Sequence, residues 1–168
     1  MTKTKTNIAR PEPIGSICWN ILASALFLGF PQIIGGWSPK TGWSPAFDAV
    51  ILRSFWAIIV LWAVIGTAKQ LIKLIDQRYT IRLAIITVAT NLATAVTTFI
   101  VFADKQLMNP LFGIAFISSL DEESAKFVSF LFGHLNLFIV GIILFALILE
   151  IGVTLWRTYK CGKEKLVS

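Results

Sequence analysis

Three ionisable residues, Arg53, His134 and Glu150, lie in or beside long apolar runs of this 168-residue chain. Charge is costly in an apolar environment, so such residues mark paired contacts, relays or solute paths. Arg53 is expected about one turn inside its run, near enough to reach the surface or to pair with Asp48 or Asp104. His134 stands alone, and we expect a hydrogen-bonded packing residue rather than a ligand.

Glu150 shares a helical face with Asn136 and Ile143 at intervals of seven, and Arg157 follows seven residues later. At the end of the helix, this row would include the positive charge of Arg157. We therefore interpret Glu150, like Arg53 and His134, as a structurally paired residue.

Two rows of small polar residues also recur at helical spacing. One contains Thr87, Thr90, Asn91, Thr94, Thr97 and Thr98, and the other contains Ser16, Asn20 and Ser24. Such side chains permit close helix packing and form hydrogen bonds of about 0.6 to 2 kcal/mol between helices. We predict helix interfaces at Ser16, Asn20, Ser24, Thr87, Asn91, Thr94 and Thr98. The alternative is a polar solute path, which would need a charged residue in mid-membrane, and the run 83–103 contains none.

No pattern in the sequence favours catalysis. The chain has one histidine, no glycine-rich phosphate loop, no paired carboxylates in an apolar run, and no serine or cysteine beside a plausible base. Cys18 and Cys161 do not make a disulfide framework or a metal-binding spacing. We expect a protein that is not an enzyme and that uses no cofactor or metal.

Composition indicates the elements that carry these residues. Hydrophobic residues make up 56% of the chain and charged residues only 14%, against about 25% charged residues in soluble domains. Apolar runs at 14–36, 49–68, 83–103 and 127–149 each approach the roughly 20 residues that a membrane-spanning helix needs. The predicted fold is an all-α integral membrane protein with four transmembrane helices.

The predicted domain organisation is a short basic N-terminus (1–13), a four-helix membrane domain (14–158) and a basic tail (159–168). Its spans are expected near 14–36, 49–68, 83–103 and 127–155. The first run could instead be a secretory signal cleaved after Ala23-Ser24-Ala25. However, Asn20 interrupts it and apolar sequence continues to Gly36, so we expect a retained helix.

The positions of Lys and Arg predict orientation. Basic residues dominate three segments: Lys3, Lys5 and Arg10; Lys69, Lys73, Arg78 and Arg82; and Arg157, Lys160, Lys163 and Lys165. The segment 104–126 is instead predominantly acidic. Both termini and the 69–82 loop are therefore expected to be cytoplasmic, and the expected location is the cytoplasmic membrane. The net charge of +6 is interpreted as topology and contact with the lipid bilayer rather than with nucleic acid.

The repeated motif GWSPKTGWSP at 36–45 follows the first run. Tryptophan prefers the membrane interface, so Trp37 and Trp43 are predicted interfacial anchors of a tight outward turn. Ser44 and Pro45 would cap and begin the second helix. A ligand-binding loop is the alternative.

The stretch LMNPLFGIAFISSL at 107–120 is uncharged but too short to span. It is expected to lie in the interface or to re-enter the membrane between the third and fourth spans. Ser119 to Glu122 resembles a capping box. The fourth helix would then begin near Leu120, with a possible kink at Gly133.

From the second span onward, the chain resembles the membrane portion of bacterial proteins that carry a small helical HAAS signalling domain. The resemblance covers about residues 14–160 and is carried by GWSPAFDAVILRSFW, KQLIKLIDQRYTIRLAIITVATNL, NPLF and LEIGVTLWRTYK. It implies a role in anti-sigma-type or transcriptional control but supplies no site residue. That group usually has a soluble helical domain before the spans, where this chain has only MTKTKTNIARPEP.

These patterns favour a non-enzymatic multi-pass membrane protein of a bacterial signalling or regulatory system. It would act through helix–helix contacts, as a homo-oligomer or with a membrane-protein partner. The alternative is a small transporter or the membrane subunit of a transporter. A third possibility is an immunity or stress protein that guards the bilayer.

Overall fold

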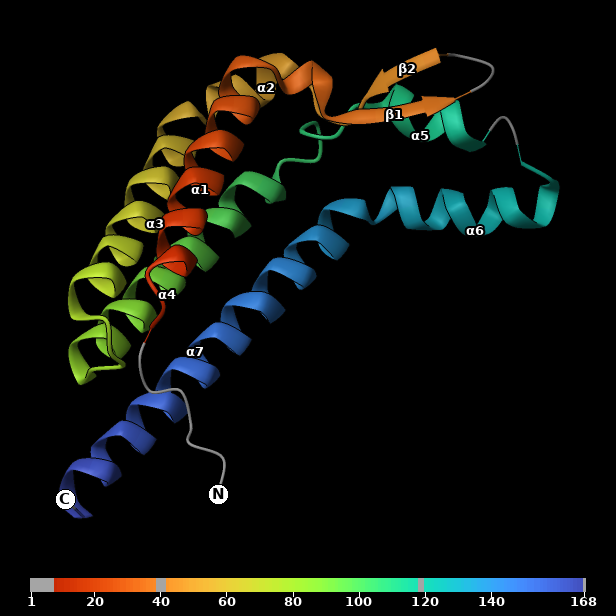
Figure 1. Cartoon of the computed structure of the whole chain (residues 1–168). Coiled ribbons are helices and arrows are strands. Elements are labelled where there is room, and N and C mark those ends of the chain that lie inside the picture. The colour runs from red at the N-terminus through yellow and green to blue at the C-terminus, as the bar shows by residue number, and fades with distance from the viewer. Residues whose placement is uncertain (1–7, 39–41, 118–119, 168) are drawn as a thin grey trace.

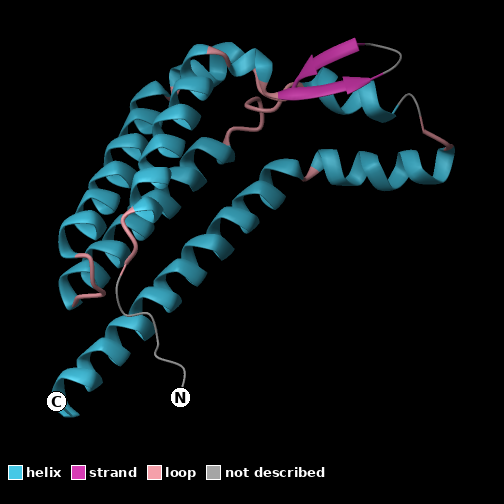
Figure 2. Ribbon diagram, viewed as in Figure 1, coloured by secondary structure: helices cyan, strands magenta, loops and turns pink. Residues whose placement is uncertain are grey.

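The computed structural model describes residues 8–38, 42–117 and 120–167. Most of them are helical (Figure 2), and the described strands are confined to one hairpin. The helices are α1 (Pro11–Gly29), α2 (Ala49–Ser54), α3 (Trp56–Asp76), α4 (Ile81–Ala103), α5 (Pro110–Ile117), α6 (Glu122–Gly133) and α7 (Leu135–Val167). A short 3-10 turn, η1 (Pro31–Ile33), precedes strands β1 (Gly35–Ser38) and β2 (Gly42–Pro45).

Four helices are long and apolar enough to cross a membrane. They cover Pro11–Gly29, Trp56–Asp76, Ile81–Ala103 and Leu135–Lys163. This agrees with the predicted all-α membrane protein.

The long helices pack in the order α1, α3, α4, α7. Helix α1 lies along α3, α3 contacts α4, and α4 lies along α7 (Figure 1). Helix α1 begins and α7 ends at the same end of this bundle, which we call the tail end. The opposite end, which carries β1 and β2, is the hairpin end.

The helix boundaries differ from the predicted spans in three places. Helix α1 ends at Gly29 rather than at residue 36, because Pro31 disfavours helical geometry at Phe30, whose φ and ψ are −134° and 48°. The second run is divided at Phe55 into α2 and α3, and α3 continues to Asp76. The predicted span 127–155 is also divided, since α6 ends at Gly133 and α7 starts at Leu135.

The GWSP repeat forms a β-hairpin in which Trp37 pairs with Trp43. Gly35 lies so close to Ser44 that an added Cβ would be 2.2 Å from the Ser44 carbonyl oxygen. The prediction that Ser44 caps the second helix is wrong, because Ser44 is held in β2. Asp48 is the N-cap, and its Oδ1 accepts hydrogen bonds from the amides of Val50 (2.8 Å) and Ile51 (3.1 Å).

The connection after α4 packs onto the segment that follows β2. The Asp48 amide donates to the Leu107 carbonyl, and the Asn109 amide donates to the Ala46 carbonyl, each at 2.9 Å. A hydrophobic cluster fills the space beneath these contacts. We call it the hairpin-end core, and it consists of Ala46, Phe47, Leu52, Ile59, Val101 and Leu107.

The apolar stretch 107–120 contains the helix α5, which packs against the hairpin and α6. The rings of Phe112 and Phe132 meet edge to face with centroids 5.4 Å apart. Asp121 caps α6, and the hydrogen bond that its carboxylate accepts from the Ser124 amide lowers the pKa of Asp121. In the predicted capping box, the N-cap is thus Asp121, and Ser119 lies outside the described residues.

Candidate functional site

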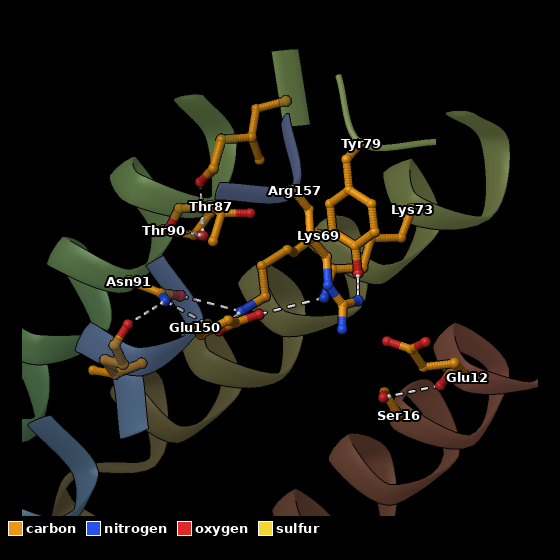
Figure 3. A network of polar contacts seen from close by, with 12 residues as sticks. Glu12, Ser16, Lys69, Lys73, Tyr79, Thr87, Thr90, Asn91, Glu150 and Arg157 are labelled. Carbon is orange, nitrogen blue, oxygen red and sulfur yellow. Dashed lines mark hydrogen bonds and ion pairs between the residues drawn. The ribbon is translucent and has the colours of Figure 1, made fainter. Parts of the chain in front are cut away.

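Charged side chains from α3 and α7 meet inside the bundle (Figure 3). The Lys69 ammonium lies 2.7 Å from Glu150 Oε2, and the Lys73 ammonium lies 3.4 Å from Glu150 Oε1. The two lysine side chains are only 12% and 10% exposed, and that of Glu150 is 29% exposed. Two cations therefore share one carboxylate in a largely buried position.

Asn91 of α4 joins this pair. Its Oδ1 accepts a hydrogen bond from Lys69 Nζ (3.1 Å), while its Nδ2 donates to Glu150 Oε2 (3.0 Å) and to the Leu147 carbonyl (3.2 Å). The side-chain amide thus bridges both charges and ties α7 to α4. We call Lys69, Lys73, Asn91 and Glu150 the charge network.

The network lies deep in the bundle. At about 1.5 Å per residue, Asn91 is about 15 Å along the helix axis from Ile81 and about 18 Å from Ala103. It is 2% exposed. The charge network therefore lies close to the middle of α4, where an unpaired charge would be most costly.

Lys69 and Lys73 were expected in a loop between the second and third spans, and this loop assignment is wrong for both residues. Both belong to α3, because partners on α4 and α7 accommodate their charge within the bundle. A signal was present in the sequence, since Leu71, Ile72, Leu74 and Ile75 continue the apolar pattern past the lysines. An amphipathic helix was thus detectable, but its partner was not.

Glu150 was expected to belong to a row ending at Arg157. Arg157 instead donates a hydrogen bond to the Tyr79 hydroxyl, and its guanidinium lies 5.0 Å from the centre of the Tyr79 ring. Seven helical residues separate Glu150 from Arg157 by about 10 Å along the axis, so α3 provides the nearer cations.

Two polar cavities adjoin the charge network. The tail-end cavity, of about 490 Å³, lies between α1 and α3; its lining includes Glu12, Ser16, Asn20, Gly66, Lys69 and Gln70. The central cavity, of about 270 Å³, is lined from all four long helices and includes Trp62, Asn91, Thr94 and Thr98. Asn20, Gly66 and Lys69 line both. Asn20 and Lys69 thus provide polar groups where the two cavities adjoin, and the lining of the central cavity is otherwise mostly apolar.

Gly66 permits the close contact of α1 with α3 at the junction of the cavities. A Cβ at Gly66 would lie 2.5 Å from Asn20 Nδ2. That amide donates to the Ala63 carbonyl (2.9 Å) and to Thr67 Oγ1 (3.4 Å). Above the central cavity, the hairpin-end core replaces polar side chains with packed apolar ones.

The predicted polar row of α4 faces its neighbours within the chain. Thr87 and Thr98 are 0% and 1% exposed. The Thr94 hydroxyl donates to the Thr90 carbonyl at 2.9 Å, and Thr97 Oγ1 accepts from Trp62 Nε1 at 2.7 Å. Thr87 Oγ1 is buried without a hydrogen-bond partner among the described residues.

The predicted row of α1 is only partly brought into contact with α3. Asn20 makes the hydrogen bonds described above. The Ser16 hydroxyl donates to the Glu12 carbonyl of its own helix at 3.0 Å, and Ser24 is half-buried.

Arg53 and His134 lie away from the charge network. Arg53 is exposed and forms no ion pair within the described ranges, because Asp48 caps α2 and Asp104 Oδ1 accepts from the Gln106 amide. His134 occupies the break between α6 and α7. Its Nδ1 lies 2.9 Å from the Phe130 carbonyl oxygen, and its ring centroid is 4.5 Å from that of Phe130.

The predicted anchors Trp37 and Trp43 are 64% and 52% exposed on the hairpin. The Trp43 indole donates to the Gln32 carbonyl at 2.8 Å, so each ring presents an apolar surface outward while one indole N–H is satisfied. This exposure suits an interfacial position.

The described part of the chain contains no group of three or more His, Cys, Asp or Glu residues that could hold a metal ion. The charge network places hydrogen-bond donors and acceptors of opposite charge within one another's reach. Comparisons with protein-family models, with characterised proteins and with solved structures found no match to this chain.

Proposed function

We propose that this chain is a non-enzymatic membrane protein that binds a polar solute between its helices, as a small transporter or the membrane subunit of a transporter. The observation that carries the proposal is the meeting of Lys69, Asn91 and Glu150 beside two polar cavities that share lining residues. Charged residues inside a membrane bundle are candidates for substrate and ion pathways, because charge is costly in lipid.

The run 83–103 contains no charged residue of its own, and the charge network places charged groups beside it. A polar path requires a charged group near mid-membrane, and α3 and α7 contribute Lys69 and Glu150 beside the middle of α4. The hydroxyl and amide groups of Asn20, Thr94 and Thr98 provide further hydrogen-bonding partners along the cavities.

The two ends of the bundle differ in packing, and transport requires such a difference between the two sides of the membrane. The tail-end cavity and the central cavity share lining residues, whereas the cavity of about 410 Å³ at the hairpin end shares none with the central cavity, and the hairpin-end core is packed with apolar side chains. With both termini in the cytoplasm of a bacterial cell, the cavities would face the cytoplasm. Transport would then require the hairpin-end core to separate while the tail end closes.

The second candidate is the signalling or regulatory module suggested by the HAAS resemblance. Helix α7 favours it, because this helix runs without a break from His134 at the hairpin side to the basic tail end. Helix α7 would thus transmit a displacement of α6 to the opposite side of the membrane. Partner or self-contacts would use the apolar outer surfaces, since Asn20 and Asn91 are engaged within the chain.

Solute uptake tests the leading proposal. Vesicles from cells that produce the wild-type chain or Glu150→Gln would be incubated with an isotope-labelled extract of small polar metabolites, and their contents compared by mass spectrometry. Lys126→Met serves as the control, because the Lys126–Glu122 pair is exposed on α6. We expect at least one solute to accumulate with wild type and the control but not with Glu150→Gln.

Equal vesicle contents for all three proteins, each present in the membrane at the same level, would contradict transport. Crosslinking in native membranes distinguishes the signalling candidate from the transporter. Recovery of a regulatory protein with Glu150→Gln would favour signalling, provided that substitutions on the apolar outer surfaces of the helices abolish that recovery.

A further inference from the structure

An open groove of about 810 Å³ lies between α4 and α7 at the tail end, and we call it the α4–α7 groove. The two helices lie along one another and run in opposite directions (Figure 1). The described residues that line the groove are apolar except for Thr158, Tyr159 and Lys163. Ile85 and Leu92 on its α4 side are exposed, so the groove opens on the outer surface of the bundle, where lipid would surround it.

The α4–α7 groove has about the depth of one leaflet of a bilayer. On α4 it extends from Ile81 to Leu92, which is about 17 Å along the axis at about 1.5 Å per residue. The hydrocarbon core of a bilayer is about 30 Å thick, so each leaflet contributes about 15 Å. Ala84, Ala89 and Gly162 contribute small side chains to the lining. The space between the helices therefore suits a lipid chain that lies along α4.

A cationic group lies at the tail-end opening of this groove. The Lys163 ammonium is 5.3 Å from the centre of the Tyr159 ring, and both residues line the groove. Both are exposed. Lys163 forms no ion pair within the described ranges, and none of the described lining residues is acidic. The ammonium is thus available to an anion that enters the opening.

The neighbouring surface of α7 carries side chains typical of a membrane interface. Trp156 and Tyr159 are exposed, and the Lys160 ammonium lies 4.7 Å from the centre of the Trp156 ring. Tryptophan and tyrosine prefer the level of the lipid headgroups. Lys160 and Lys163 are three residues apart and are therefore neighbours on the helix surface. The two cations would lie at headgroup level, with the apolar groove extending from them into the hydrocarbon.

We infer that the α4–α7 groove binds an anionic phospholipid of the leaflet at the tail end. One acyl chain lies between α4 and α7, and the lipid phosphate pairs with Lys163 and Lys160. Basic pockets between transmembrane helices bind anionic headgroups in this way. A zwitterionic lipid has the same chains, but its own cation offsets the attraction of its phosphate. This inference does not depend on transport, because the groove shares no lining residue with the tail-end cavity or the central cavity.

Native mass spectrometry of the purified full chain in a neutral detergent measures bound lipid and oligomeric state together. The probes are dioleoylphosphatidylglycerol, dioleoylphosphatidylcholine, which has the same chains, and glycerophosphate, which has the charge without the chains. We expect one phosphatidylglycerol per chain, bound about tenfold more tightly than phosphatidylcholine, and no binding of glycerophosphate.

Two substitutions test the two parts of the site. Lys163→Gln should weaken phosphatidylglycerol binding about fivefold, as expected for one lysine near an anionic headgroup, and should leave phosphatidylcholine binding unchanged. Lys126→Gln, on exposed α6, is its control. Ala89→Phe should weaken the binding of both lipids, because the ring would occupy the groove. Val96→Phe is its control, since Val96 is exposed seven residues further along α4 and does not line the groove.

Equal affinity for the two phospholipids, with no effect of Lys163→Gln, would overturn the inference. So would phosphatidylglycerol binding that Ala89→Phe leaves unchanged, because the lipid would then lie elsewhere. Glycerophosphate binding as tight as that of phosphatidylglycerol would indicate an anion site without a lipid chain and would also contradict it. A dimer that Ala89→Phe converts to monomers, with no lipid bound to either form, would show instead that a second copy of the chain occupies the groove.

Discussion

At the scale of single residues, the arrangement depends on how one carboxylate is shared by two lysines. Glu150 lies between Lys69 and Lys73. Asn91 donates a hydrogen bond to Glu150 and accepts one from Lys69. A buried ion pair is weak evidence for stability by itself, yet loss of one member leaves a charge without compensation. A single substitution in the charge network should therefore lower stability strongly, whereas substitution of both members of an ion pair should lower it only mildly.

Glu150→Ala should lower the free energy of unfolding by about 3 kcal/mol, because both lysines lose their carboxylate. Adding Lys69→Met should recover part of this loss. Unfolding of the single and double variants in detergent gives the coupling energy between the two positions. Simple addition of the two single effects would show that the Lys69–Glu150 contact is absent.

Gly66→Ala should displace the Asn20 side chain, because the added Cβ would lie 2.5 Å from Asn20 Nδ2. The hydrogen bonds of Asn20 to Ala63 and Thr67, which join α1 to α3, would then be lost. Gly152→Ala is the matched control, since nothing lies within 4 Å of a Cβ there. Crosslinking between cysteines placed on α1 and α3 should fall in the first variant and not in the second. Equal crosslinking would contradict the close packing at this junction.

The sequence predicted several of these residues individually but not their association. Asn20, Asn91 and Glu150 stood out because polar groups are rare in apolar runs. Their partners Lys69 and Lys73 did not, because a lysine after an apolar run usually marks a loop. The distances from Lys69 to Asn91 and to Glu150 join residues 22 and 81 positions apart, and periodicity alone does not specify such pairings.

At the scale of elements, helices were easier to predict than their ends. The run 83–103 corresponds closely to α4 (Ile81–Ala103), because apolar sequence and helix coincide there. The break at His134 agrees with the kink predicted at Gly133, where α6 ends. The break at Phe55 was not predicted, and Phe55 packs against the hairpin-end core, which forms from residues far apart in the sequence. The same limit explains the hairpin, where Asp48 rather than Ser44 caps the next helix.

Asp48→Ala should destabilise the start of α2, because two backbone amides lose their acceptor. A cost of about 1 kcal/mol is expected for a lost N-cap. Hydrogen exchange at Val50 and Ile51 should increase, while Asp48→Asn should retain most of the protection. Unchanged exchange in the alanine variant would show that the Asp48 cap does not form in solution.

At the scale of the whole molecule, the two ends of the bundle differ in how they are packed. The hairpin-end core packs α2, α3, α4 and the following connection into a closed apolar unit. The tail end leaves a cavity between α1 and α3 that shares lining residues with the central cavity. A cavity of about 410 Å³ at the hairpin end, lined in part by Lys105, His134 and Asn136, shares none with it. We therefore expect access to the central cavity from the tail end, and the distribution of Lys and Arg predicts that this end faces the cytoplasm.

Accessibility of a cysteine in the central cavity tests this account most directly. Thr94→Cys would be made in a Cys18→Ala, Cys161→Ala background and exposed to a membrane-impermeant thiol reagent from either side. Val96→Cys is the control, because Val96 is 61% exposed on the outer surface of the same helix, where lipid would cover it.

The reagent should label Thr94→Cys from the cytoplasmic side only, and it should leave Val96→Cys unlabelled from both sides. Protection of Thr94→Cys from both sides, or labelling only from the external side, would contradict a polar cavity open to the cytoplasm.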